Sequence, residues 1–243
     1  MTSLHHEYLA ALGIGRWVLK QAPVAQLAPR DEEAGPEPQV SRIEITARAP
    51  QSDGGRESGC DWPMLKERVA ACTRCPLHAT RTQTVFGVGD MQADWLIVGE
   101  APGAEEDARG EPFVGRAGQL LNAMLKAVGL AREQVYIANV LKCRPPGNRD
   151  PAPPEASECL PYLEQQIALL KPKILLAVGR ISAQNLLRTD APLGRLRQQV
   201  HRFGLSQVPL VATYHPAYLL RTPGDKRKAW EDLKFAREVS RRV

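Results

Sequence analysis

The chain has 243 residues, enough for one α/β domain with a full core and an appendage but short for two domains of ordinary size. Lys and Arg outnumber Asp and Glu by 32 to 27, and the pI of about 9.0 mildly favours a polyanionic partner such as nucleic acid, although ordinary enzymes often carry as much charge. No apolar run of about 18 residues and no secretory signal is visible, so we expect a cytoplasmic protein without a membrane span. In that reducing compartment, five cysteines indicate metal binding or chemistry before disulfides.

The N-terminal quarter differs in composition from the rest of the chain. Residues 1–21 contain a short apolar cluster made of Tyr8, Leu9, Leu12, Ile14, Trp17, Val18 and Leu19. Residues 22–61 are rich in Pro, Gly and acidic residues and have no sustained helical period, which predicts a flexible linker. Because an apolar peptide on a tether is typical of a docking element, we predict a docking peptide over 1–21, a linker over 22–61 and one folded domain over 62–243.

From residue 94 onward, strand and helix patterns alternate. Apolar runs rich in β-branched residues predict four strands, WLIVG (95–99), VYIANV (135–140), KILLAVG (173–179) and VPLVATY (208–214). Helical spacing predicts helices over 117–128 before a stop at Gly129, over 155–170, near 181–187 and over 225–242, the last with Trp230, Leu233 and Val239 among its apolar positions. Such alternation predicts an α/β fold with a central, mostly parallel four-stranded sheet flanked by helices.

Unusual residues follow each predicted strand. The turn GEAPG (99–103) follows the first strand, Asn139 lies near the end of the second, Gly179 and Arg180 follow the third, and Tyr214, His215 and Pro216 follow the fourth. In parallel sheets, ligands bind outside the carboxyl ends of the strands, so we expect the functional site at this edge.

Four cysteines are grouped in two chain segments. Cys72 and Cys75 form a C-x2-C pair, and Cys143 and Cys159 flank a proline-rich loop. Four thiolates suit either tetrahedral zinc or an iron-sulfur cluster, and spacing alone favours zinc. The alternative is that Cys143 and Cys159 are merely buried thiols. Cys60, at the end of the linker, is interpreted as a non-ligand.

Several side chains near the strand ends have the chemistry of a base-binding site. Backbone N–H groups of the turn from Gly99 to Gly103 are able to hold an anionic oxygen. Phe113, in a glycine-punctuated loop, is either a core residue or a platform on which a base stacks. The carboxamide of Asn139 either bonds the donor-acceptor edge of a pyrimidine or is satisfied by nearby backbone. In HPAYLLR (215–221), Arg221 is placed to meet a phosphate and a leucine to wedge between bases.

Together these stretches resemble the family 4 uracil-DNA glycosylases from residue 62 to the end of the chain. GEAPG, PFVGRAG, NVLKCRPPGNRDP and HPAYLLR occur in order, with all four cysteines of that family. The resemblance implies hydrolysis of the N-glycosidic bond of deoxyuridine in DNA, which leaves an abasic site. It also favours a 4Fe-4S cluster over zinc, with the ligands Cys72, Cys75, Cys143 and Cys159.

The resemblance further implies roles for the site residues. Uracil stacks on Phe113, is read by Asn139, and receives a hydrogen bond from His215 as the bond breaks. Gly99, Ala101 and Gly103 contribute the backbone of the binding turn, and Leu219 and Arg221 contact DNA. Ala101 stands where the best-known branch of the superfamily has a water-positioning aspartate, so the remaining catalytic candidates are Glu100 and Glu106. Glu106 either activates water or excludes the methyl group of thymine.

Three further expectations concern reaction type and partners. Because no histidine lies between Asn139 and Cys159, we predict a monofunctional hydrolase and not the branch that traps DNA covalently. The N-terminal LGIGRWVLK resembles the start of the psi subunit of DNA polymerase III, which implies the clamp loader as a second partner beside uracil-containing DNA. The simplest expectation is a nucleoid-associated monomer. The alternatives are a metal-stabilised DNA-binding or replication-associated module without activity, and a glycosylase for another damaged base.

Overall fold

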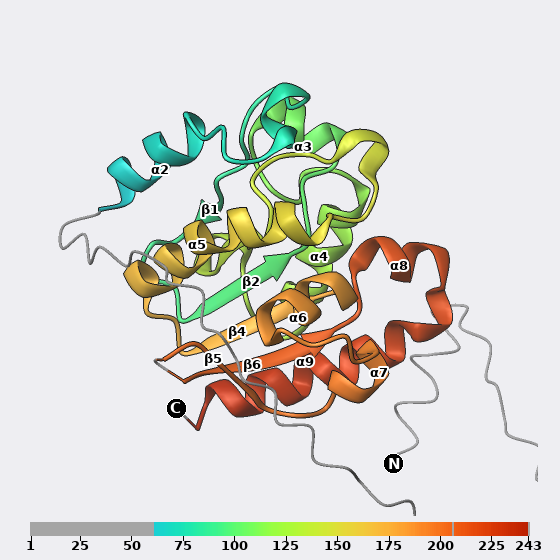
Figure 1. The fold of residues 1–243 in the computed structure, drawn as a ribbon. Helices are drawn as coiled ribbons and strands as arrows, with labels where there is room; N and C mark the ends of the chain where they lie inside the picture. The colour runs from blue at the N-terminus through green and yellow to red at the C-terminus, as the bar shows by residue number, and fades with distance from the viewer. Residues whose placement is uncertain (1–60, 206, 243) are drawn as a thin grey trace, which may run out of the picture. The chain divides into compact units, whose positions relative to one another are not determined.

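The structure is a computed structural model that describes residues 61–205 and 207–242 (Figure 1). The predicted docking peptide, the linker up to residue 60 and Cys60 lie outside the described residues. Asp61 begins the described part as the N-cap of the first helix, where its Oδ1 accepts a hydrogen bond from the N–H of Met64 at 2.9 Å. Within the described residues, no helix is long and apolar enough to cross a membrane.

Six strands form one sheet in the order β1-β3-β2-β4-β6-β5. Their bounds are β1 Val88–Gly89, β2 Trp95–Gly99, β3 Tyr136–Asn139, β4 Ile174–Val178, β5 His201–Phe203 and β6 Val208–Thr213. The four central strands are parallel, which confirms the predicted four-stranded core. The short edge strands β1 and β5 are antiparallel to β3 and β6 and were not predicted from the sequence.

Helices cover both faces of the sheet, as expected for parallel strands that are buried on both sides (Figure 1). The α-helices are α2 Trp62–Ala70, α3 Ala104–Arg109, α4 Arg116–Ala127, α5 Pro153–Leu170, α6 Arg180–Leu187, α7 Leu193–Leu196, α8 Pro216–Arg221 and α9 Lys226–Ser240. Short 3-10 helices lie between them at η1 Pro76–Ala79, η2 Arg132–Gln134, η3 Pro146–Asn148 and η4 Pro223–Asp225. The four predicted helices correspond to α4, α5, α6 and α9.

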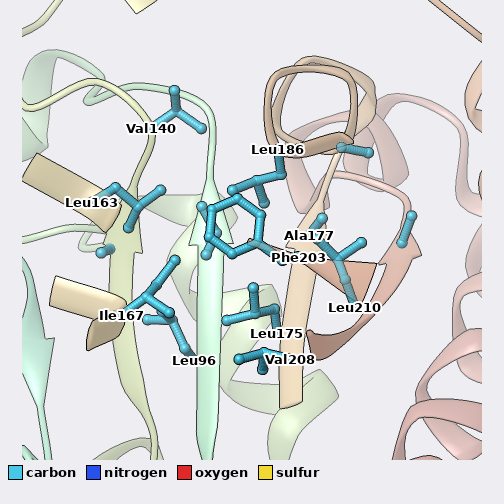
Figure 2. Close-up of a cluster of buried hydrophobic side chains, with 14 of the residues drawn as sticks. Leu96, Val140, Leu163, Ile167, Leu175, Ala177, Leu186, Phe203, Val208 and Leu210 are labelled. Carbon is cyan, nitrogen blue, oxygen red and sulfur yellow. The ribbon is translucent and has the colours of Figure 1, made fainter. Parts of the chain in front are cut away.

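Alternate residues of each strand pack into two separate cores. Leu96 and Val98 of β2 face α5, α6 and α7 in the cluster drawn in Figure 2, together with Leu163 and Leu186. Trp95 and Ile97 point to the opposite face, where α4, α8 and α9 pack. In α9, Leu233 and Val239 are buried in this core, whereas Trp230 is 39% exposed.

A third cluster joins α2 to α5 beside the end of β3. Leu65 and Val69 of α2 pack there against Leu141, and the cluster contains Cys143 and Cys159. The cysteines therefore lie where three chain segments meet. The carboxyl ends of β2, β3, β4 and β6 all lie at one edge of the sheet, and the loops after them build the site.

Candidate active site

A cavity opens at the carboxyl edge of the parallel strands. Its lining comes from the segments that follow β2, β3 and β6, and consists of Glu100, Ala101, Pro102, Gly103, Glu106, Phe113, Ala117, Asn139, Pro145, Asn148, Arg149, Asp150, His215, Ala217, Tyr218 and Arg221. Eight residues predicted from the sequence thus line one cavity, namely Glu100, Ala101, Gly103, Glu106, Phe113, Asn139, His215 and Arg221. Gly99 lies beneath it, and Leu219 does not reach it.

Asn139 presents an unpaired polar atom at this site. The residue ends β3 and is 2% exposed, and its Oδ1 is buried without a hydrogen-bond partner among the described residues. Its main-chain oxygen accepts a hydrogen bond from Lys142 Nζ at 2.9 Å, which fixes the backbone at this point. A buried acceptor left unpaired costs about 1–3 kcal/mol, so Oδ1 is the natural place for a donor supplied by a ligand.

Gly99 allows the two principal side chains of the site to meet. It pairs with Asn139 on the neighbouring strand. A Cβ at Gly99 would overlap Asn139 Oδ1 and would come within 2.7 Å of two ring carbons of Phe113. Only a glycine therefore leaves room for the amide and the aromatic ring to lie side by side over the end of β2.

Phe113 is held in an unusual conformation. Its φ of 55° lies in the left-handed region, which is uncommon for a residue other than glycine, and its side chain is 7% exposed. The loop closes tightly at this point because a Cβ at Gly118 would overlap the Phe113 carbonyl. The Phe113 ring centroid lies 5.6 Å from that of His215, with 31° between the planes.

His215 is the N-cap of α8, and its Nδ1 accepts a hydrogen bond from the N–H of Ala217 at 3.1 Å. Burial and, to a smaller extent, the charge of Arg221 lower the pKa of His215 to about 4, against the opposing effect of Glu106. The imidazole is therefore neutral at physiological pH. Since Nδ1 is occupied as an acceptor, the proton lies on Nε2, which is a hydrogen-bond donor.

The two candidate carboxylates are in different environments. Glu106 Oε1 accepts hydrogen bonds from the N–H groups of Val114 at 3.0 Å and Gly115 at 3.2 Å, so this carboxylate braces the Phe113 loop. For Glu100, burial and, to a smaller extent, the charge of Asp150 raise the pKa to about 7, against the opposing effect of Arg180. Glu100 is thus the cavity carboxylate that changes charge near neutral pH.

Helix α8 corrects one prediction. Leu219 is 1% exposed and packs in the core with α4 and α9, so it is not available to contact DNA. Leu220 is 37% exposed. Adjacent helical residues point about 100° apart, and the sequence alone did not say which of the two leucines faces outward.

Eight lining residues were not predicted as site residues, and three of them form a polar stretch within one loop. Asn148, Arg149 and Asp150 belong to the loop between Cys143 and α5. Asp150 forms an ion pair with Arg180 at 3.1 Å, and Arg149 makes two hydrogen bonds to Glu155, at 2.6 and 2.8 Å. The sequence offered one indication of their role, namely that they follow the strand β3. They lie nine or more residues beyond the end of β3, so this indication was too weak to identify them.

The four predicted ligand cysteines line one small cavity between η1, the segment after β3, and α5. Cys143 and Cys159 are buried, whereas Cys72 and Cys75 are partly exposed, and all four are free thiols. Two N–H donors reach the sulfurs, from Arg81 Nη1 to Cys143 at 3.0 Å and from the Lys142 backbone to Cys159 at 3.2 Å. Within the described residues, no three His, Cys, Asp or Glu side chains are gathered closely enough to hold a single metal ion.

Comparison with known proteins agrees with this geometry. Residues 86–234 match the family model of the Uracil DNA glycosylase superfamily. The chain is 44% identical over 182 residues to a type-4 uracil-DNA glycosylase of Archaeoglobus fulgidus, covering 72% of this chain and 91% of that protein. It is 46% identical over 179 residues to the type-4 enzyme of Pyrobaculum aerophilum (71% and 91% covered) and 40% identical over 178 residues to that of Thermotoga maritima (72% and 92%). The chain therefore belongs to the type-4 uracil-DNA glycosylases.

Proposed function

We propose that this protein hydrolyses the N-glycosidic bond of deoxyuridine in DNA, releasing uracil and leaving an abasic site for base excision repair. The observation that carries this proposal is the buried, unpaired Oδ1 of Asn139 beside the Phe113 ring. Uracil has an N3–H donor and an O4 acceptor on adjacent atoms, which match the oxygen and the N–H2 of one carboxamide. Against the amide orientation that binds uracil, cytosine presents an acceptor at N3 to the Asn139 oxygen and a donor at N4 to its N–H2, so neither hydrogen bond forms.

Departure of the base creates a uracil anion, and His215 is suited to stabilise it. A neutral imidazole that donates from Nε2 strengthens its hydrogen bond as negative charge grows on the uracil carbonyl. Backbone N–H groups of the turn from Gly99 to Gly103 add further donors. In a buried pocket such donors are stronger than in water, and removing one typically lowers the rate by a factor of about 100 to 1000.

Glu100 is the residue we assign to the attacking water. Ala101 has no carboxylate, and the Glu106 carboxylate is occupied by the Phe113 loop. Glu100 lines the same cavity, and its pKa of about 7 allows a substantial fraction to be ionised at physiological pH. We assign Glu106 to shaping the pocket against thymine, because Glu106 lines the cavity and its position is fixed by the loop amides.

On the DNA side, α8 provides a cation and an apolar side chain. Arg221 lines the cavity and is placed to meet a phosphate next to the extruded nucleotide. Leu220, and not Leu219, is the exposed leucine able to fill the space left in the duplex.

We also propose that Cys72, Cys75, Cys143 and Cys159 hold a 4Fe-4S cluster. The donor set fits the group, because a 4Fe-4S cluster takes one thiolate on each of its four irons and does not need the sulfurs to converge on a single ion. Four thiols line one cavity, and N–H donors from Arg81 and Lys142 point at two of the sulfurs. Burial raises the pKa of Cys143, and that of Cys159 to about 11, so without a bound metal these thiols keep their protons. When bound, the cluster would act as a crosslink joining η1, the end of β3 and α5.

The N-terminal segment is assigned separately. We propose residues 1–21 as a docking peptide for the clamp loader, joined by residues 22–61 to the catalytic domain over 62–243. A synthetic peptide of residues 1–25 should bind the clamp-loader core, and a peptide with Trp17→Ala should bind less well. Absence of binding by the natural peptide would remove this assignment and leave the glycosylase proposal unaffected.

The decisive experiment is single-turnover cleavage of a labelled uracil-containing oligonucleotide, with alkali used to reveal abasic sites. Wild-type protein should cleave, and Asn139→Ala and His215→Ala should each be slower by at least about 100-fold. A thymine-containing oligonucleotide is the matched substrate control. Lack of cleavage by folded, cluster-loaded wild type would instead indicate a DNA-binding or replication-associated module.

A further inference from the structure

The Phe113 loop is held from two sides by side chains of opposite charge. On one side, Arg132 of η2 donates from Nη2 to the Pro112 carbonyl at 2.7 Å and from Nη1 to the Phe113 carbonyl at 3.4 Å. On the other, Glu106 accepts from the N–H groups of the next two residues, Val114 and Gly115. Four consecutive backbone units, from residue 112 to residue 115, are therefore bonded by one guanidinium and one carboxylate.

Arg132 is tied to the helix that follows the loop as well as to the loop itself. Its Nη1 also donates to Asn122 Oδ1 of α4 at 3.1 Å. The guanidinium makes no hydrogen bond to a carboxylate among the described residues; its bonds go to two carbonyls and an amide. Burial lowers the pKa of Arg132 against the opposing effect of Glu111 and Glu133. A cation partly removed from water and directed at backbone carbonyls is suited to fixing a backbone position.

Arg132 binds the backbone of the loop at the point where Phe113 has its unusual conformation. Phe113 has a positive φ, and its ring fits closely against Asn139 over Gly99. Its ring position therefore depends on the backbone at residues 112 and 113. A lysine has a single terminal nitrogen and does not reproduce the fork that spans two carbonyls.

We propose that Arg132 is a positioning residue for uracil recognition, which holds the stacking face of Phe113 in place from outside the cavity while Glu106 holds the other half of the loop. The proposal rests on the proposed function, because it requires that uracil stack on Phe113. It predicts that loss of the guanidinium weakens binding of uracil and slows its excision, and leaves binding of the DNA backbone intact.

The variants for the test are Arg132→Met and Arg132→Lys. The matched control is Arg188→Met, which removes an arginine whose side chain is 80% exposed and whose ion pair with Glu164 spans 3.6 Å. Each variant is measured for single-turnover uracil excision, inhibition by free uracil, affinity for an oligonucleotide with an abasic-site analogue, and thermal unfolding. Both Arg132 variants should excise uracil about 10- to 100-fold more slowly, since a displacement near 1 Å costs up to about that factor. They should also be inhibited less by uracil, with unchanged affinity for the abasic analogue.

A double-mutant cycle with Phe113→Ala separates positioning from a general structural role. If Arg132 acts through the ring, Arg132→Met should cause little further loss of rate in the Phe113→Ala background. Losses that multiply, or an Arg132→Met variant with the wild-type rate, would overturn the proposal. If Arg132→Met does not fold, Arg132→Lys in the same cycle decides the question, because it keeps the charge and loses the fork. Wild type and Arg188→Met must excise uracil; if they do not, it is the proposed function that fails.

Discussion

The rings of Phe113 and His215 lie 5.6 Å apart and 31° from coplanar, although about 100 residues separate the two in the sequence. One belongs to the loop before α4 and the other begins α8. In the proposed uracil complex, a base stacked on Phe113 would lie close to the imidazole of His215. Stacking and hydrogen bonding from His215 would then act on the same ligand.

The close approach over Gly99 predicts the effect of adding one methyl group. Gly99→Ala places a carbon in the space of Asn139 Oδ1 and against the Phe113 ring, so both side chains must move. Single-turnover excision should fall by about 100-fold, as expected for a displacement near 1 Å at a reacting centre. Gly194→Ala is the matched control because its added carbon meets nothing within 4 Å. Equal rates for both variants would contradict the proposed uracil pocket.

Adjacent leucines of α8 should give opposite phenotypes. Leu219→Ala opens a cavity in a packed core and should lower the free energy of unfolding by about 2–5 kcal/mol. Leu220→Ala changes an exposed side chain and should alter stability by no more than about 0.5 kcal/mol. Leu220→Ala should slow excision from duplex DNA several-fold and affect excision from single-stranded DNA less. Only in a duplex does the extruded nucleotide leave a space in the base stack that the leucine side chain fills. Chemical denaturation and single-turnover rates on both substrates measure the two effects.

The pKa of Glu100 predicts how activity varies with pH. If Glu100 acts on water as a carboxylate, the single-turnover rate should rise with pH through about 7, and Glu100→Gln should lose this dependence. The negative charge of Asp150 raises the pKa of Glu100, so Asp150→Asn should move the midpoint of the pH–rate profile to lower pH. The positive charge of Arg180 lowers the pKa of Glu100, so Arg180→Met should move that midpoint to higher pH. A wild-type midpoint that neither variant shifts would exclude Glu100 as its origin.

His215 should make stability depend on pH in acid. Its pKa falls from 6.5 in the unfolded chain to about 4 in the folded protein, so between these values the unfolded state binds more protons. Its contribution is therefore complete above pH 6.5 and is lost as the pH falls toward 4. Urea unfolding at several pH values should show a smaller acid loss for His215→Asn than for wild type. Glu100 acts in the opposite direction between 4.5 and about 7, and the comparison with the variant cancels its effect.

Removal of one proposed ligand should separate the cluster from a zinc site. Cys72→Ser should lose iron, inorganic sulfide and visible absorption together and should unfold at lower temperature, because the proposed cluster would crosslink three segments. Cys60→Ser, which changes the cysteine interpreted as a non-ligand, should keep all three. About four irons per wild-type chain would support the cluster, whereas one zinc without sulfide would contradict it.

The main elements of this fold were predictable because their signals are local. Four apolar runs identified the parallel strands, since strands buried on both faces need nearly continuous apolar sequence. The edge strands β1 and β5 were missed because two and three residues carry too short a pattern, and their pairing depends on β3 and β6. The positions of Asn139 at the end of β3 and of His215 after β6 were enough to place both at one sheet edge.

By itself, the sequence determined the chain order of the four central strands and of α4, α5, α6 and α9, the four-cysteine set and the motifs that identify the family, because residue type and spacing are properties of the chain. Only the tertiary structure decided which of Leu219 and Leu220 is exposed, because a helix face is chosen by its packing. Likewise it decided that Glu106 binds the Phe113 loop and that Arg132, distant in the sequence, reaches the same loop from η2. Such contacts join residues that no local pattern relates, so they exist only once the sheet and its helices have packed.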